Sequence, residues 1–326
     1  MSTMSAIVVT LRCGDGAHMD TRYGPSPLRE RYNKTILTHE AAKDLSGFKS
    51  GAVNFKLGFW DPSVNGVRYL KALIYNLAAG LSSENWARLR KIKNRDTGSP
   101  ISIHYNGEPV CMDYLLAVLE LDFIARDVDL TGQRVLEVGA GYGRSCHAML
   151  SNYDVETYHI VDLDNSLELA RGYLASVLDE HEYAKVRFVS PGDLDALPDD
   201  ETFGLGLSVN AFAEMPVATV RDYLSLLDRR ARHVYVRDAV GKYLEPDLDG
   251  HAHGRDLVGM ALSTGPLQQV IDIHDSAAVE RQAERFVEVH RPGPDWSCVN
   301  SAWARPWSYY WQALYRHRSD DAPEVP

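Results

Sequence analysis

Cysteine is scarce in this sequence, and long apolar runs are missing from it. The four cysteines are scattered and include no C-x-x-C pair, so neither a disulfide framework nor a thiolate zinc site is indicated. No apolar run approaches the ~20 residues that a membrane helix requires, and the first residues lack the basic segment of a signal peptide. We therefore expect a cytoplasmic protein without membrane contact.

An excess of basic residues is also missing. The chain carries 34 basic and 45 acidic residues, for a formal net charge of −11. An acidic protein repels phosphate backbones, which argues against nucleic acid as a partner. Small cationic molecules are better candidates, because an acidic cleft concentrates them.

The rhythm of apolar residues divides the 326-residue chain into two regions and a tail. Residues 1–125 show no alternation of strands and helices but contain helical patterns such as Val67–Ala79 and Cys111–Ala125. We interpret this region as a mainly helical cap, which also offers a surface for a homodimer. Strand-like and helix-like segments alternate through 126–318, as in a parallel α/β sheet. The acidic, proline-containing tail, 319–326, is predicted to be disordered.

The second region predicts a doubly wound, mostly parallel seven-stranded sheet. Five short apolar runs are predicted strands: Arg134–Val138, Thr157–Val161, Lys185–Val189, Phe203–Val209 and His233–Arg237. Helices are predicted between them, at 143–151, 166–179 and 216–228. Two further β-like stretches, Arg285–His290 and Tyr309–Arg316, are predicted to close the sheet as a hairpin.

The most informative motif follows the first of these strands. Glu137 lies at the end of an apolar run that leads into Gly139, Gly141 and Gly143, and a helix pattern begins there. Glycines let the backbone approach a ligand closely. A dinucleotide fingerprint would have a third glycine at 144, where this chain has Arg144, and no P-loop lysine follows. The Glu137 carboxylate suits an ammonium group, which S-adenosylmethionine has and NAD lacks; a coincidental glycine-rich turn is the alternative.

Acidic residues also follow the next two predicted strands. Asp162 ends the second apolar run, where a carboxylate accepts hydrogen bonds from ribose hydroxyls; Asp164 is the competing candidate. Asp193 follows the third strand, where it would accept from the adenine amino group, or else be an ordinary turn aspartate. These positions are consistent with one adenosine-containing cofactor.

Three segments carry a family resemblance, over about residues 110–240. They read LEVGAGYGR, YHIVDLDNSLELARGYL and SVNAFAEMP, and they resemble the Rossmann-like S-adenosylmethionine-dependent methyltransferases. More narrowly, they are similar to the sugar O-methyltransferase branch, which includes aminoglycoside N-methyltransferases of the kind found in gentamicin biosynthesis. That branch has Asp-Leu-Pro after the second strand, whereas this chain has Asp162-Leu163-Asp164, so we expect its cofactor contacts to differ slightly there.

The resemblance implies roles for individual residues. The residues expected to line the methionine end of the cofactor are Glu137, Gly139, Gly141 and Gly143. Asp162, followed by Leu163, would hold the ribose, and Asp193 with Leu194 would flank the adenine. Asn210 and Ala211 would lie beside the methyl donor. Glu214 would face the acceptor, or else complement the dipole of the next helix.

The segment Tyr243–Asp256 places two histidines among carboxylates. His251 or His253 is our candidate for the base that removes the acceptor's proton. The candidates for binding ammonium groups of a cationic sugar are Glu245, Asp247, Asp249 and Asp256. A solvated polar loop is the alternative, and the H-x-H pair lacks a convincingly spaced third metal ligand, so no metal is expected.

The resemblance implies, and the net charge and acidic segment favour, an enzyme that methylates a sugar amine of an aminoglycoside in antibiotic biosynthesis, converting S-adenosylmethionine to S-adenosylhomocysteine. Two alternatives stay open. One is O-methylation of a neutral glycoside, which the branch resemblance favours. The other is a non-catalytic cofactor-binding subunit, which would bind the cofactor but turn over no acceptor.

Overall fold

A computed structural model describes residues 25–36, 38–40, 43, 62–198, 200–244 and 255–318. The chain divides into two units, residues 1–69 and 70–326. In the first unit, helix α1 (Pro27–Thr35) begins after Ser26, whose Oγ accepts the Arg29 N–H at 3.2 Å. This side chain satisfies one of the free N–H groups at the helix start. The division predicted at residue 125 stays a prediction.

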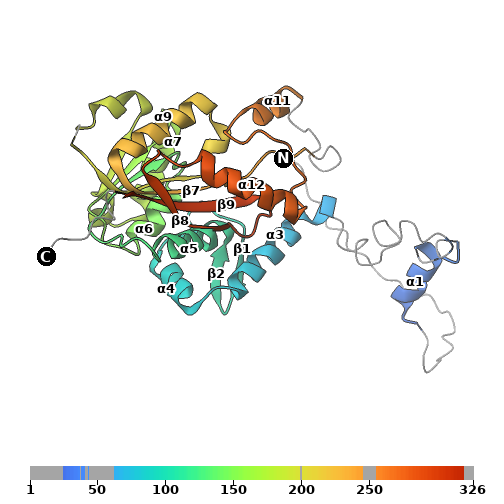
Figure 1. Ribbon diagram of the computed structural model, residues 1–326. Coiled ribbons are helices and arrows are strands. Elements are labelled where there is room, and N and C mark those ends of the chain that lie inside the picture. Colours follow the sequence, from blue (N-terminus) through green and yellow to red (C-terminus); the bar gives the residue numbers. More distant parts are fainter. Residues whose placement is uncertain are drawn as a thin grey trace. The chain divides into compact units, whose positions relative to one another are not determined.

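A seven-stranded sheet forms the centre of the second unit (Figure 1). Its order is β5-β4-β3-β6-β7-β9-β8, and β9 runs antiparallel to both of its neighbours while β3 to β7 are parallel. The predicted α/β fold class is therefore confirmed. The strands are β3 (Arg134–Val138), β4 (Thr157–Val161), β5 (Val186–Val189), β6 (Phe203–Val209), β7 (Ala231–Ala239), β8 (Trp296–Trp303) and β9 (Tyr310–His317).

The order of the strands creates a switch point between β3 and β6. From β3 the chain adds β4 and β5 on one side, and then returns to add β6 and β7 on the other. The connections that leave β3 and β6 therefore diverge at the carboxyl ends of these strands. In open α/β sheets this is where ligands bind.

Helices cover both faces of the sheet. Successive residues of a strand point to opposite faces, and so Val135 belongs to one hydrophobic core and Leu136 to the other. The helices that follow the strands are α6 (Arg144–Leu150), α7 (Asp164–Val177), α8 (Glu180–Tyr183), α9 (Val217–Arg230), α11 (Arg255–Ser263) and α12 (Ser276–Val289), with the short 3₁₀ turns η2 (Pro191–Ala196) and η3 (Phe212–Glu214). None of the helices in the described ranges has the length and apolar character of a membrane span.

The segment before the sheet contains α3 (Pro62–Ala79), α4 (Ser83–Lys91) and α5 (Met112–Ile124). Ile74, Leu89 and Leu115 share a hydrophobic core with the sheet. A hairpin of β1 (Ser102–Tyr105) and β2 (Glu108–Cys111), which the sequence analysis missed, precedes α5. Its two-residue turn, Asn106-Gly107, has positive φ at both positions, as a type I′ turn requires.

The predicted strand Arg285–His290 is wrong, because most of this segment belongs to α12. Val279, Ala283 and Phe286 are buried at helical spacing, and their burial outweighs the short β-like alternation of 285–290. The partner of β9 in the closing hairpin is instead β8. In β8, a register shift between Cys298 and Asn300 interrupts the alternation of inward and outward side chains. For this reason the sequence pattern did not indicate the strand.

Candidate active site

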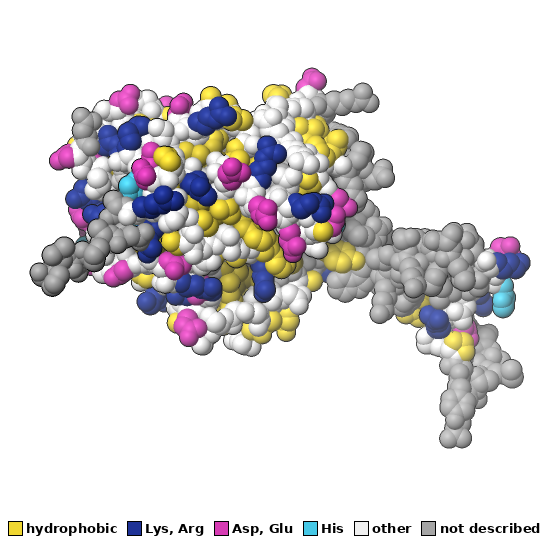
Figure 2. Space-filling model, viewed as in Figure 1, with side chains coloured by type: hydrophobic (Ala, Val, Ile, Leu, Met, Phe, Trp, Pro, Cys, Tyr) yellow, Lys and Arg dark blue, Asp and Glu magenta, His cyan; other side chains and the backbone are white. Residues whose placement is uncertain are grey.

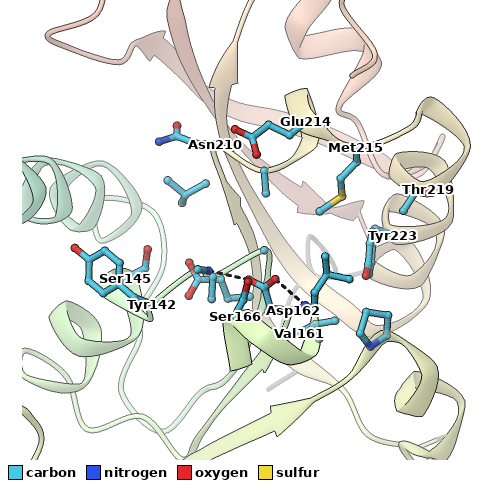
Figure 3. Close-up of a pocket in the computed structure, with 18 of the residues that line it drawn as sticks. Tyr142, Ser145, Val161, Asp162, Ser166, Asn210, Glu214, Met215, Thr219 and Tyr223 are labelled. Carbon is cyan, nitrogen blue, oxygen red and sulfur yellow. Dashed lines mark hydrogen bonds between the residues drawn. The ribbon is translucent and has the colours of Figure 1, made fainter. Parts of the chain in front are cut away.

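A cavity of about 630 Å³ opens at the switch point of the sheet. We call it the donor cavity (Figure 3). The predicted cofactor residues that line it are Glu137, Gly139, Gly141, Asp162, Leu163, Asn210 and Ala211, and the predicted acceptor residue Glu214 lines it too. They come from the ends of three parallel strands, which the sheet brings to one edge.

The three glycines of the loop after β3 differ in the space around them. Gly139 has a φ of 75°, and a Cβ at this position would lie 2.3 Å from the Cβ of Ala211. Gly141 also has positive φ, but a Cβ there would meet no atom within 4 Å. Gly143 does not line the cavity; a Cβ there would approach the Leu174 side chain at 2.8 Å. Gly139 and Gly143 therefore permit close packing, and Gly141 leaves space for a ligand.

Asp162 joins the glycine loop to the end of β4. Its Oδ2 accepts the Gly141 N–H at 2.8 Å, and its Oδ1 accepts the Leu163 N–H at 2.7 Å (Figure 3). Each oxygen retains acceptor capacity, so the carboxylate can still bind two hydroxyl groups. Asp164, the competing candidate, is an exposed residue in the first turn of α7 and does not line the cavity.

Glu137 is a buried carboxylic acid in the cavity wall. Its side chain accepts a hydrogen bond from the Tyr158 hydroxyl at 2.7 Å, and the residue is only 1% exposed. Burial raises the pKa of Glu137 to about 7, although hydrogen bonds from Tyr158 and Ser145 oppose the shift. A cationic group that enters the cavity would favour the ionised form.

A buried network of charged side chains contacts Asn210 in the wall of this cavity. Arg144 and Arg237 both approach the Glu120 carboxylate of α5, at 2.9 Å and 3.5 Å. Arg237 also donates to Oδ1 of Asn210 at 2.5 Å. Because arginine only donates, the amide oxygen of Asn210 must face it, which leaves the NH₂ group as a donor for other partners.

The backbone of Asn210 has a φ of 59°, which is uncommon outside glycine. Strain of this kind persists where surrounding contacts determine the conformation. Here the Asn210 N–H donates to the Arg237 carbonyl oxygen at 2.8 Å, in addition to the side-chain contact. Arg237 therefore holds both the backbone and the side chain of Asn210 at the cavity wall.

A second cavity, of about 590 Å³, lies beside η3 and α11. We call it the tyrosine pocket, because Tyr243, Tyr309 and Tyr310 line it together with aliphatic side chains. Glu214 lines both the tyrosine pocket and the donor cavity. In Figure 3 its carboxylate lies near Asn210.

The backbone next to Glu214 is fixed from two sides. Asp238 accepts the Ala213 N–H at 2.8 Å, and Lys242 donates its Nζ to the Ala213 carbonyl oxygen at 2.9 Å. Burial raises the pKa of Asp238 to about 6 and lowers the pKa of Lys242. These two groups are engaged with the backbone, whereas no hydrogen bond or ion pair joins the Glu214 side chain to another described residue.

The remaining predicted site residues lie elsewhere. Asp193 and Leu194 belong to η2 and do not line the donor cavity, although Pro191 of the same turn does. Asp256 is exposed in the first turn of α11 and lines neither cavity. The predicted base and acceptor residues that lie outside the described residues are Glu245, Asp247, Asp249, His251 and His253.

Several lining residues were not anticipated. In the donor cavity they include Tyr142, Ser145, Ser166, Met215, Thr219 and Tyr223. Most lie one to four residues inside the helix that follows a strand, or in the turn before it. Their position just after a predicted strand was the only indication in the sequence that they line the cavity. Their residue types are not characteristic of one cofactor.

Comparison with known proteins gives structural neighbours only. No family model and no curated protein matches the sequence. The pyocyanin biosynthetic protein PhzM aligns over 85% of this chain and 76% of its own, with 17% identity and a TM-score of 0.42. The glycopeptide N-methyltransferase MtfA aligns over 62% and 90%, with 16% identity and a TM-score of 0.40.

An O-methyltransferase from neocarzinostatin biosynthesis, solved with S-adenosylmethionine and a naphthoic acid, aligns over 63% of this chain and 56% of its own. Its identity is 17% and its TM-score 0.38. The fold and the cavity by themselves define a doubly wound α/β protein with a candidate ligand site at its switch point.

Proposed function

We propose that the protein is an S-adenosylmethionine-dependent methyltransferase. The observation that supports this most is the donor cavity, in which a buried acid (Glu137), an open glycine position (Gly141) and a strand-end acid (Asp162) line one space. The Glu137 carboxylate suits an ammonium group, and the Asp162 carboxylate suits ribose hydroxyls. Gly141 leaves space for the ligand between them. A pyrophosphate would be repelled by these two acids.

Arg144 does not weaken this assignment. It occupies the position where a dinucleotide fingerprint has its third glycine, and an unpaired cationic side chain there would attract phosphate. Its guanidinium instead pairs with Glu120 at 2.9 Å and donates to the Asp113 carbonyl oxygen. The charge of Arg144 is thus neutralised within the protein.

S-adenosylmethionine, when bound, supplies a methyl group already activated on a sulfonium. The protein then has to align the acceptor and remove one proton from it. In our proposal, Asn210 lies beside the methyl donor in the donor cavity, and Glu214 lines both cavities. Glu214 binds the acceptor, and the proton passes to a base for which His251 and His253 are candidates.

We further propose a sugar amine as the acceptor, with aminoglycosides as the class that the net charge of −11 favours. The Glu214 carboxylate between the two cavities supports a cationic acceptor. O-methylation of a neutral glycoside is the second candidate, supported by the resemblance to sugar O-methyltransferases. Measuring acceptor binding at several salt concentrations distinguishes the two candidates. Binding of a polycation weakens as ionic strength rises, whereas binding of a neutral glycoside does not.

Calorimetry with S-adenosylhomocysteine tests the cofactor assignment. We expect the wild-type protein to bind it, and Asp162→Ala to reduce the affinity at least tenfold. Asp164→Ala is the matched control, because Asp164 is exposed and lies outside the cavity. Equal affinity in Asp162→Ala and wild type would show that Asp162 is not the ribose ligand.

A homodimer is also part of the proposal. Tyr75 of α3 and Ile101, both in the second unit, are large apolar side chains that remain exposed. Such residues are typical of surfaces that are covered in an assembly. Light scattering at two protein concentrations would give twice the monomer mass, and a monomer mass at both would refute the dimer.

A further inference from the structure

The tyrosine pocket adjoins the donor cavity but differs from it in chemistry. Besides three tyrosines, its walls contain the aliphatic side chains Leu244, Leu257, Val258, Met260 and Leu262. Lys242 also lines the pocket, and its Nζ donates to the Ala213 carbonyl oxygen. The rings of Tyr243 and Tyr309 pack at 5.2 Å between centroids, and those of Tyr309 and Tyr310 at 4.9 Å. The pocket therefore presents an apolar, aromatic wall next to the Glu214 carboxylate.

A buried arginine packs against the aromatic wall of the tyrosine pocket. The Arg237 guanidinium lies 4.9 Å from the centroid of the Tyr310 ring, at a distance that permits a cation–π contact. Arg237 is itself buried and donates to Asn210 of the donor cavity. One buried arginine therefore contacts a lining residue of each cavity, Asn210 in the donor cavity and Tyr310 in the tyrosine pocket.

Large apolar side chains remain exposed around this pocket. Leu257 and Met260 of α11 are 48% and 58% exposed, and Tyr243 and Leu244 are exposed as well. Figure 2 shows hydrophobic side chains at the surface where Figure 1 places α11. Exposed apolar groups gathered around a pocket mark a ligand or partner surface, unlike single ones scattered elsewhere.

We infer that the methyl acceptor is an amino sugar joined to an apolar, ring-containing aglycone, with its amine at Glu214 and its aglycone in the tyrosine pocket. Because Glu214 lines both the tyrosine pocket and the donor cavity, a group bound in the tyrosine pocket would lie next to the donor, as a methyl acceptor must. The carboxylate accounts for one ammonium group, and the apolar wall accounts for the ring beside it. This inference rests on the proposed function and narrows its acceptor class.

Matched glycosides test the inference. We would measure binding of the 4-nitrophenyl and methyl glycosides of glucosamine and of glucose, by calorimetry at saturating S-adenosylhomocysteine. We expect the aryl amino glycoside to bind at least tenfold more tightly than the methyl amino glycoside. We also expect it to bind more tightly than aryl glucoside, whose hydroxyl replaces the amine.

Variants assign each preference to its side chain. Met260→Asp should abolish the preference for the aryl group and keep wild-type affinity for S-adenosylhomocysteine, because Met260 does not line the donor cavity. Glu214→Gln should abolish the preference for the amine and keep the preference for the aryl group. Leu169→Asp is the matched control for folding, because Leu169 is 60% exposed on α7 and lines neither cavity. It should leave both preferences unchanged.

Three results would overturn the inference. They are equal affinity for the aryl and methyl glycosides, an aryl preference that survives in Met260→Asp, and no aryl binding by a protein that binds S-adenosylhomocysteine. Tighter binding of kanamycin than of any aryl glycoside would also contradict the inference, because it would indicate that the acceptor is a polycationic aminoglycoside. Failure to bind S-adenosylhomocysteine would instead refute the proposed function itself, so the two failures are distinguishable.

Discussion

Replacing Glu120 with glutamine removes the carboxylate that Arg144 and Arg237 share. The pairs measure 2.9 Å and 3.5 Å, and the side chains of Arg144, Glu120 and Arg237 are 13%, 8% and 2% exposed. Glutamine preserves the shape of the side chain but removes the carboxylate that both guanidinium groups approach. Breaking a buried pair in this way costs about 3–5 kcal/mol, a large part of the roughly 5–15 kcal/mol by which a domain is stable.

Urea unfolding followed by circular dichroism measures this cost. The matched control is Glu156→Gln, which breaks the ion pair with Arg134 at 3.1 Å, where the side chains are 40% and 54% exposed. An exposed pair of this kind contributes less than about 1 kcal/mol. If Glu120→Gln lost no more stability than Glu156→Gln, the buried network would not support the site as we describe it.

Two further predictions concern the donor cavity. Burial raises the pKa of Glu137 from 4.5 to about 7, so the folded state binds the proton more tightly than the unfolded state and loses stability as pH rises through this window. Relative to Glu137→Gln, the ligand-free wild type should lose about 3 kcal/mol between pH 4.5 and 8; a constant difference in urea titrations would contradict the burial of an ionisable Glu137. Gly139→Ala should lower the melting temperature more than Gly141→Ala, because only the former places a Cβ against Ala211. Gly141→Ala should fold yet lose S-adenosylhomocysteine affinity, and the reverse ranking would contradict the loop geometry.

The strands that build the site could be predicted from the sequence. Strands β3, β4 and β6 have the bounds expected from their apolar runs, because each run is buried on both faces and ends at glycine, aspartate or asparagine. In a parallel sheet these ends meet at one edge. For this reason the shared cavity of Glu137, Asp162 and Asn210 follows from their spacing alone.

The supporting contacts could not be predicted, because they join distant segments. Glu120 lies on a helix before the sheet, whereas its partner Arg237 lies in β7, and nothing local to either residue indicates the pair. Tyr309 and Tyr243 meet only because β9 lies beside β7. The error at Arg285–His290 has a related cause, since helical burial of Phe286 depends on the sheet that it packs against.

The most direct test of the proposed methyl transfer is mass spectrometry. The protein would be incubated with methyl-labelled S-adenosylmethionine and a panel of aminoglycosides, aryl amino glycosides and neutral glycosides. Our account predicts a labelled methyl group on an amine-containing glycoside, and its loss in Asp162→Ala. No labelled product from any acceptor, with no binding of S-adenosylhomocysteine in calorimetry, would contradict it.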